Sequence, residues 1–301
     1  MVKELGPTAV FLPEVGIGTS DYHAGPSPLR RGFEAGALFI DTAESYGTEE
    51  VVGEALKGLR NRVFVATKVS PENFRRARLQ ASVNASLQRL GIDTIDLLQL
   101  HKPNPTIPIQ ETMDALADLV DAGKVRFVGV SNFSLAQLEE ARRALPKYPI
   151  VSNQVRYNLI DRTIEQGLSQ YCQANHITVI AYSPLGRGLH RLKDCDPAGV
   201  LDHLSREIGK SPAQIALNWC LCKEGVVVIP KGNSEEHILD NCAASDWRLS
   251  AEQIDLLDAT IQYRYRGRFD ALLRRFTPDA LRPVALRALH YLPRGLRRRV
   301  N

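Results

Sequence analysis

The sequence predicts an α/β fold, a single-domain TIM barrel of the (β/α)8 type that carries a basic C-terminal tail. Short runs rich in Val, Ile and Leu recur eight times along the chain, and segments with helical spacing lie between them. The runs are apolar almost throughout rather than alternating, which is typical of parallel strands buried on both faces. The length of 301 residues is a little above that of a typical barrel of this type.

The predicted strands are the apolar runs at 15–19, 37–41, 63–68, 95–101, 125–132, 150–154, 177–182 and 226–231. Apolar residues at helical spacing predict helices at 49–59, 76–90, 110–121, 135–144 and 212–222. Two helix starts are marked by a hydroxyl that can cap the helix, Thr48 before Glu49 and Ser211 before Pro212. We expect the barrel to span residues 1–263 and the basic extension residues 264–301.

The composition favours a cytoplasmic protein with a large core. Hydrophobic residues make up 44% of the chain and charged residues 24%, and the apolar runs are shorter than the roughly 18 residues of a membrane span. The first residues lack the apolar core of a signal peptide. The five cysteines form no CxxC pair, which argues against a disulfide framework and a zinc site. We expect no nucleic-acid partner, because the sequence carries no motif for one.

Four polar residues lie at or just past the carboxyl ends of neighbouring predicted strands. Asp41, Lys68 and His101 end three successive strands, and Tyr46 follows Asp41 by five residues. The carboxyl ends of the strands form the active-site face of such a barrel, so the four side chains are expected to converge. A hydrolytic metal site would gather several carboxylates and histidines, which this set lacks. We therefore expect no metal.

The chemistry of these four residues indicates a tuned proton donor. Pairing with Asp41 would keep Lys68 charged, which argues against a lyase that uses Lys68 as a Schiff base. A charged Lys68 beside Tyr46 is expected to lower the pKa of the phenol from about 10 toward neutrality, because it stabilises the phenolate. Tyr46 would then act as a general acid near pH 7, and His101 would hydrogen-bond the substrate oxygen.

Seven motifs resemble those of the aldo-keto reductases, and they occur in the same order along the chain. They are FIDTAESYG, ATK, LLQLHKP, GVSNF, NQVRYN, AYSPLGRG and IPKGNSEEHILDN, and the resemblance covers residues 9–262. It implies a barrel that transfers a hydride from NADPH to an aldehyde or ketone without a metal. By the same resemblance Asp41, Tyr46, Lys68 and His101 are the catalytic tetrad.

The resemblance also implies a cofactor site. Ser131, Asn132 and Gln154 would bind the nicotinamide carboxamide, and Tyr182 would stack on the nicotinamide ring. The rest of this site would consist of Gly18, Thr19, Asp41, Ser183, Leu185, Gly186, Lys231, Ser234, His237 and Asn241. NADPH is the expected cofactor and NADH the alternative, because His237 stands where relatives that prefer NADPH often have arginine.

The substrate and the tail are less defined by the sequence. The substrate pocket is expected to include Tyr22, Tyr46 and His101, but Tyr22 does not stand directly after the first strand as the pocket aromatic of many relatives does. From residue 264 onward the chain has eleven arginines and two acids, about +9, against about −5 for the first 263 residues. This tail could contact an acidic surface, or its apolar side chains could pack on the barrel.

The predicted protein is an enzyme that acts on a small-molecule carbonyl substrate as a monomer or loose dimer. The alternative from another class is a nucleotide-binding regulatory subunit on the same fold with little turnover. The presence of all four tetrad residues favours the enzyme.

Overall fold

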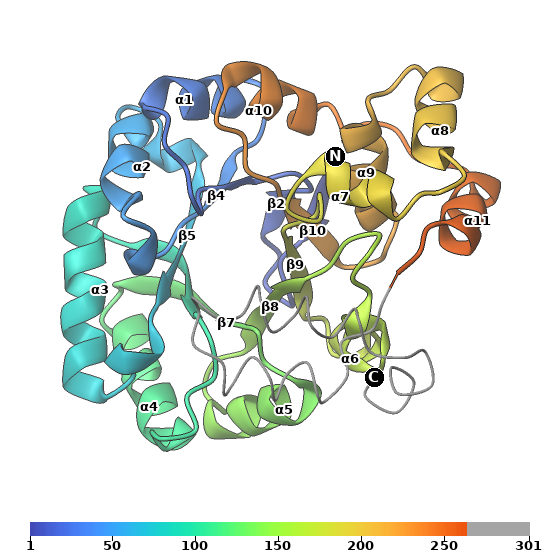
Figure 1. Ribbon diagram of the computed structural model, residues 1–301. Helices are drawn as coiled ribbons and strands as arrows, with labels where there is room; N and C mark the ends of the chain where they lie inside the picture. Colours follow the sequence, from blue (N-terminus) through green and yellow to red (C-terminus); the bar gives the residue numbers. More distant parts are fainter. Residues whose placement is uncertain (264–301) are drawn as a thin grey trace, which may run out of the picture.

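Eight parallel strands form the barrel in the computed structural model, which describes residues 1–263 (Figure 1). They are neighbours in chain order: β3 (Ile17–Gly18), β4 (Phe39–Asp41), β5 (Phe64–Val69), β6 (Ile95–Leu100), β7 (Val125–Ser131), β8 (Ile150–Arg156), β9 (Thr178–Tyr182) and β10 (Val226–Ile229). Every neighbouring pair is parallel. The predicted (β/α)8 architecture is confirmed. The predicted C-terminal tail lies outside the described residues.

The barrel closes between β3 and β10. A parallel bridge joins Val15 to Val228, and the amide of Gly18 donates to the carbonyl oxygen of Pro230 at 3.0 Å. Only glycine fits at position 18, because a Cβ there would lie 2.6 Å from the carbonyl oxygen of Ile229. The first strand, β3, has two residues and is shorter than the predicted run at 15–19.

Eleven α-helices occur among the described residues, and most of them surround the strands (Figure 1). The five predicted helices are confirmed as α2 (Glu49–Leu56), α3 (Arg76–Leu90), α4 (Ile109–Asp121), α5 (Leu135–Ala144) and α9 (Pro212–Leu221). The other helices are α1 (Pro26–Glu34), α6 (Leu168–Ala174), α7 (Leu189–Asp194), α8 (Val200–Ile208), α10 (Glu235–Cys242) and α11 (Ala251–Thr260). Helices α1 and α10 lie side by side, which brings both ends of the barrel chain together.

The two predicted helix caps differ in outcome. Ser211 accepts a hydrogen bond from the amide of Gln214 in a capping box, as predicted. Thr48 is the N-cap residue of α2, so the predicted helix start is confirmed, but its side chain makes no capping bond. Its hydroxyl lies 2.8 Å from that of Thr42 and 3.0 Å from that of Thr19, which follow β4 and β3.

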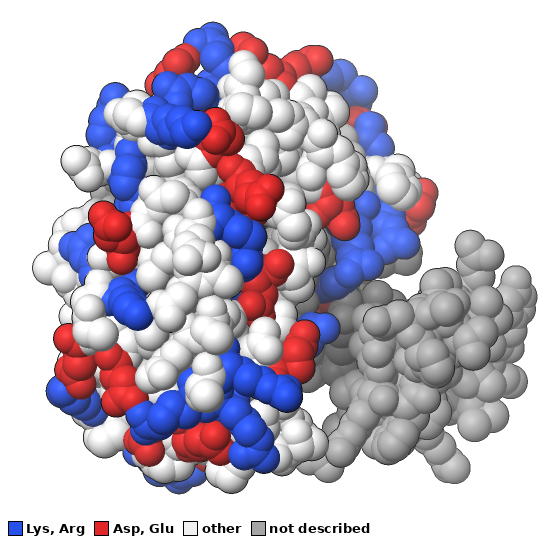
Figure 2. Space-filling view, turned by 90° about the vertical axis from the view of Figure 1, so that its left-hand side faces the viewer, with Lys and Arg blue, Asp and Glu red and all other residues white. Residues whose placement is uncertain are grey.

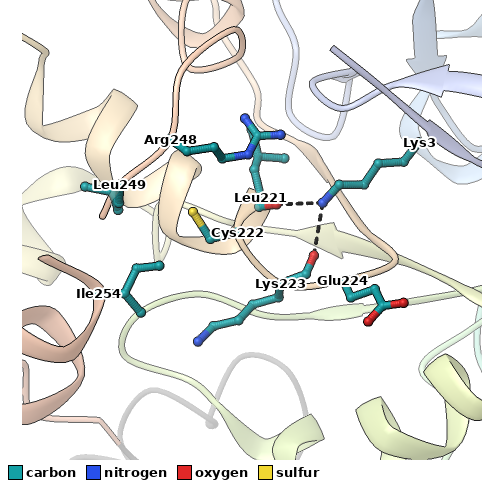
Figure 3. A pocket seen from close by; sticks show the side chains of 8 residues that line it. All are labelled: Lys3, Leu221, Cys222, Lys223, Glu224, Arg248, Leu249 and Ile254. Atoms are coloured by element: carbon teal, nitrogen blue, oxygen red, sulfur yellow. Dashed lines mark hydrogen bonds between the residues drawn. The ribbon is translucent and has the colours of Figure 1, made fainter. Parts of the chain in front are cut away.

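A hairpin that the sequence analysis did not predict closes the amino end of the barrel. Strands β1 (Val2–Glu4) and β2 (Phe11–Pro13) pair antiparallel, and Leu5 and Leu12 pack against the barrel interior. From β1, Lys3 Nζ donates to the carbonyl oxygens of Leu221, Lys223 and Val226, at 2.6, 3.0 and 2.8 Å. Lys3, Leu221 and Lys223 border a shallow hollow where β10 begins (Figure 3). This hollow lies at the end of the barrel opposite the predicted tetrad.

The outer surface carries interspersed charges. On the face shown in Figure 2, which includes the side of α2 and α3, acidic and basic side chains alternate without a field of one sign. Several pair between neighbouring elements, such as Arg75 with Glu111 at 3.0 Å. Within residues 1–263, every helix is too short or too polar to cross a membrane.

Candidate active site

A buried ion pair between Asp41 and Lys68 forms the centre of the site. Asp41 ends β4 and Lys68 lies on the adjacent β5, and neither is exposed by more than 2%. Lys68 Nζ lies 2.5 Å from Asp41 Oδ1 and donates to the carbonyl oxygen of Thr42 at 2.8 Å. Burial disfavours the ammonium, but the attraction of Asp41 outweighs it and the pKa of Lys68 is raised. The predicted pairing is confirmed, and a lysine held charged is unsuited to Schiff-base chemistry.

Two glutamines hold the other carboxylate oxygen of Asp41. Gln99 Nε2 on β6 and Gln154 Nε2 on β8 donate to Oδ2 at 3.1 and 2.7 Å. The sequence analysis missed Gln99. A signal was available, because Gln99 interrupts an apolar strand two positions before His101 and therefore faces the same side.

Tyr46 lies over this ion pair on a one-turn 3-10 helix, η1 (Glu44–Tyr46). Lys68 Nζ is 4.8 Å from the centre of the Tyr46 ring. The Tyr46 hydroxyl is 3.5 Å from Nε2 of His101, which follows β6, and the two rings meet edge to face. The structure thus brings all four predicted catalytic residues together.

The predicted direction of the Tyr46 pKa shift was wrong for this structure. Burial of the phenol raises its pKa, Lys68 lowers it and Asp41 raises it again, and the net shift is upward. The sequence indicated the cation but not the depth of burial, which disfavours the phenolate. Tyr46 is therefore protonated at neutral pH, which is the state that a proton donor needs.

His101 is a neutral imidazole in this environment. Burial lowers its pKa to about 4, and the positive charges of Lys68 and Lys102 act in the same direction. Its Nδ1 lies 3.5 Å from the hydroxyl of Ser45. A neutral ring beside the Tyr46 hydroxyl can hydrogen-bond a substrate oxygen without competing as an acid.

A set of amides and hydroxyls lies beside the tetrad, at the ends of β7, β8 and β9. Asn132 Nδ2 donates to the carbonyl oxygen of His101 and to Ser131 Oγ, both at 3.0 Å, and Asn132 Oδ1 accepts from the Tyr182 hydroxyl at 2.9 Å. Asn132 and Ser183 have positive φ values of 61° and 48°. Strained backbone of this kind clusters at binding sites. These amides, with the flat Tyr182 ring, fit a nicotinamide carboxamide and its ring.

Arg156 is a further polar residue that the sequence analysis did not assign. It ends β8, two residues after Gln154, and its guanidinium lies 5.4 Å from the centre of the Tyr182 ring. Its buried Nε has no hydrogen-bond partner among residues 1–263. Leu185 and Gly186, which has left-handed backbone, follow in the loop after β9.

Four residues predicted for the cofactor site, Lys231, Ser234, His237 and Asn241, follow β10 near the seam of the barrel. Lys231 follows β10, and its Nζ donates to the carbonyl oxygen of Asp21 at 3.0 Å. Ser234 caps α10 by accepting from the amide of His237. An exposed lysine before a helix N-terminus fits a phosphate group. The fourth residue, Asn241, is buried on α10.

Three other predicted site residues face inward. Thr19 is fully buried, and its hydroxyl donates to the carbonyl oxygen of Asp41 at 3.0 Å. Gly18 lies in the seam described above. Tyr22 is 5% exposed and its hydroxyl donates to the carbonyl oxygen of Gly25, and burial raises its pKa to about 12. The structure therefore brings Tyr22 into the hydrophobic core, and its hydroxyl points to Gly25.

Comparisons with known proteins agree with this arrangement. The model of the Aldo/keto reductase family matches residues 24–262. Methylglyoxal reductase YeaE of Escherichia coli (strain K12) is 36% identical over 259 residues, covering 83% of this chain and 91% of that protein. Glyoxal reductase of Bacillus subtilis (strain 168) is 34% identical, covering 83% and 89%. A crystal structure of an aldo-keto reductase from Klebsiella pneumoniae with NADPH matches with a TM-score of 0.78 at 36% identity, covering 88% of this chain and 98% of that one.

Proposed function

This chain belongs to the aldo-keto reductase family, and we propose that it reduces small 2-oxoaldehydes, such as methylglyoxal, to hydroxy compounds with Tyr46 as the proton donor. As a member of the family it is an NADPH-dependent carbonyl reductase. The substrate class is supported by two relatives named for methylglyoxal and glyoxal. The observation that carries the role of Tyr46 is its place, with the hydroxyl 3.5 Å from His101 Nε2 and the ring over Lys68 Nζ.

NADPH supplies the hydride when bound, and the residues of this chain supply the proton. The Tyr46 hydroxyl donates its proton to the carbonyl oxygen as the carbonyl carbon accepts the hydride, so that an alcohol forms. The neutral His101 hydrogen-bonds the same oxygen. Lys68 then stabilises the Tyr46 phenolate, while Asp41 keeps Lys68 in place until solvent returns the proton.

The groups at the strand ends would hold the cofactor. Asn132, Ser131 and Gln154 would bind the carboxamide, Tyr182 would stack on the ring, and Lys231 would attract the 2′-phosphate. A cytoplasmic location accords with the free thiols of Cys172, Cys220, Cys222 and Cys242.

Loss of NADPH absorbance in the presence of methylglyoxal, glyoxal and simple aldehydes tests the proposal. We expect turnover with a higher kcat/KM for the 2-oxoaldehydes than for simple aldehydes of the same length. Turnover that favours the simple aldehydes would reject the substrate class. Tight NADPH binding without turnover on any aldehyde would favour the regulatory subunit instead.

A further inference from the structure

Glu44 fixes the short helix that carries Tyr46. It is the first residue of η1, and Tyr46 is the last. Glu44 Oε1 accepts hydrogen bonds from the amide of Ser70 at 2.6 Å and from Nδ2 of Asn73 at 3.0 Å. Its second oxygen accepts from the hydroxyl of Ser82 on α3. One half-buried carboxylate therefore joins η1 to the segment after β5 and to α3.

The helix η1 is too short to be held by its own backbone. It has only one turn. Ala43 precedes it and makes no capping hydrogen bond with its side chain, and Gly47 follows it with left-handed backbone. Its backbone bond from the amide of Tyr46 to the carbonyl oxygen of Ala43 is 3.0 Å long. A single turn does not hold its own geometry, because one hydrogen bond does not offset the cost of ordering it. The place of Tyr46 therefore depends on contacts that η1 makes with the barrel.

Glu44 makes these contacts close to the catalytic lysine. Ser70 follows Lys68 by two residues, so the hydrogen bond from Ser70 to Glu44 ties the turn that bears the phenol to the strand that bears the ammonium. We propose that Glu44 is a positioning residue, which holds the Tyr46 hydroxyl beside Lys68 and His101. The proposal rests on the proposed role of Tyr46 as the proton donor.

Glu49 offers a matched control within the same segment. It starts α2, is 1% exposed, and accepts from the hydroxyl of Thr67 on β5 at 2.6 Å. Arg89 on α3 pairs with it at 2.6 Å. Both acids thus join the segment after β4 to β5 and α3, but Glu49 lies on α2 and not on the short helix that carries Tyr46. Loss of Glu49 should affect stability, and loss of Glu44 should affect the chemistry.

The first test compares kcat for methylglyoxal in Glu44→Ala, Glu44→Gln and Glu49→Ala. We expect Glu44→Ala to lower kcat by about 10- to 100-fold, since a shift of about 1 Å at a reacting group can cost that much. Affinity for NADPH, measured by fluorescence titration, should stay near wild type. Glu44→Gln keeps an oxygen for the amide of Ser70 and should recover most of the loss. Glu49→Ala should lower Tm and leave kcat of the folded protein near wild type.

The second test uses the reverse reaction, in which Tyr46 must lose its proton before it can accept one from the alcohol. Lys68 lowers the pKa of Tyr46, so a phenol that moves away from Lys68 should ionise at higher pH. We expect the pH midpoint of alcohol oxidation to rise in Glu44→Ala and to stay in Glu49→Ala. The charged and titratable groups near the phenol are Lys68, Asp41, His101 and Tyr182.

The inference is overturned if Glu44→Ala and Glu49→Ala lower kcat to the same extent and both lower Tm, while the pH midpoint of alcohol oxidation stays unchanged in both. A wild-type protein without turnover on any aldehyde would contradict the proposed function instead. In that case the pKa of Tyr46 can still be measured by following tyrosine absorbance in the near ultraviolet as the pH is raised. The titration curve of the Tyr46→Phe variant is subtracted from that of its parent protein, and the difference belongs to Tyr46. An identical Tyr46 pKa in the wild-type and Glu44→Ala backgrounds would then reject the inference.

Discussion

The two ends of the barrel treat polar groups differently. At the carboxyl end, Lys68 and Asp41 are buried as a charged pair, and Asn132 and Ser183 have left-handed backbone. At the amino end, the β1–β2 hairpin fills the opening with Leu5 and Leu12, and Lys3 donates to backbone carbonyls and pairs with Glu14 at 3.8 Å, away from the tetrad. Strain and buried charge cost stability, and proteins retain them where chemistry needs them. Substitutions should therefore change the rate at one end and stability at the other.

The largest expected effect is that of Tyr46→Phe at the carboxyl end. The change removes the proton donor and little volume, so kcat for carbonyl reduction should fall by about 10² to 10⁴-fold. The unfolding free energy and the affinity for NADPH should stay near wild type. Steady-state kinetics and urea unfolding of the same preparation measure both. A retained kcat would show that another group donates the proton.

Leu12→Ala tests the amino end. Leu12 is 1% exposed inside the barrel opening, so its truncation should lower the unfolding free energy by about 2–5 kcal/mol. The kcat of the folded protein should not change. Phe11→Ala is the control, because the adjacent Phe11 is 59% exposed and should cost far less. Equal losses in the two variants would mean that the hairpin does not pack as a plug.

Lys231→Ala tests the seam of the barrel at the carboxyl end. Removal of the ammonium should weaken NADPH binding by about tenfold and NADH binding much less, because only NADPH carries the 2′-phosphate. His237→Arg should widen the preference for NADPH by adding a permanent charge. The negative charge of Glu235 should reduce this gain little, since Arg31 pairs with Glu235 at 2.9 Å. Fluorescence titration with both nucleotides measures this, and equal weakening of both would mean that Lys231 does not contact the 2′-phosphate.

The smallest effect concerns the pH dependence of stability. His101 has a lowered pKa of about 4 in the folded protein, whereas the unfolded chain takes up the proton near 6.5. The contribution of His101 to stability is therefore fully present above 6.5 and is lost as the pH falls toward 4. Urea unfolding at several pH values measures the loss, which should be smaller in His101→Gln. An identical pH dependence in both proteins would contradict the lowered pKa.

The sequence predicted the fold and the meeting of the tetrad because both follow from one rule. Parallel strands joined by helices bring their carboxyl ends to one face of the barrel. The convergence of Asp41, Lys68 and His101 could therefore be predicted without knowing how the side chains pack. The hairpin escaped prediction because β1 and β2 have three residues each, too few to show a period.

Features that depend on tertiary contacts could not be predicted. Thr48 reads as a helix cap from its neighbours in sequence, but its partners Thr19 and Thr42 come from the folded loops. The pKa of Tyr46 depends on burial as much as on Lys68, and a sequence does not state burial. Glu44 resembles any acid in a loop until α3 and the segment after β5 are placed beside it.

The seam between β3 and β10 determines how late in synthesis the chain can complete its cofactor site. The tetrad comes from β4 to β6, within residues 41–101, which leave the ribosome early. The seam forms only after residue 229 has been made, when Gly18 reaches the backbone of Ile229 and Lys231 reaches Asp21. A partly synthesised chain thus contains every catalytic side chain but lacks the wall that Lys231 belongs to. If Lys231 binds the 2′-phosphate, nucleotide would select for the closed barrel by mass action, and NADPH would serve as a check on complete folding.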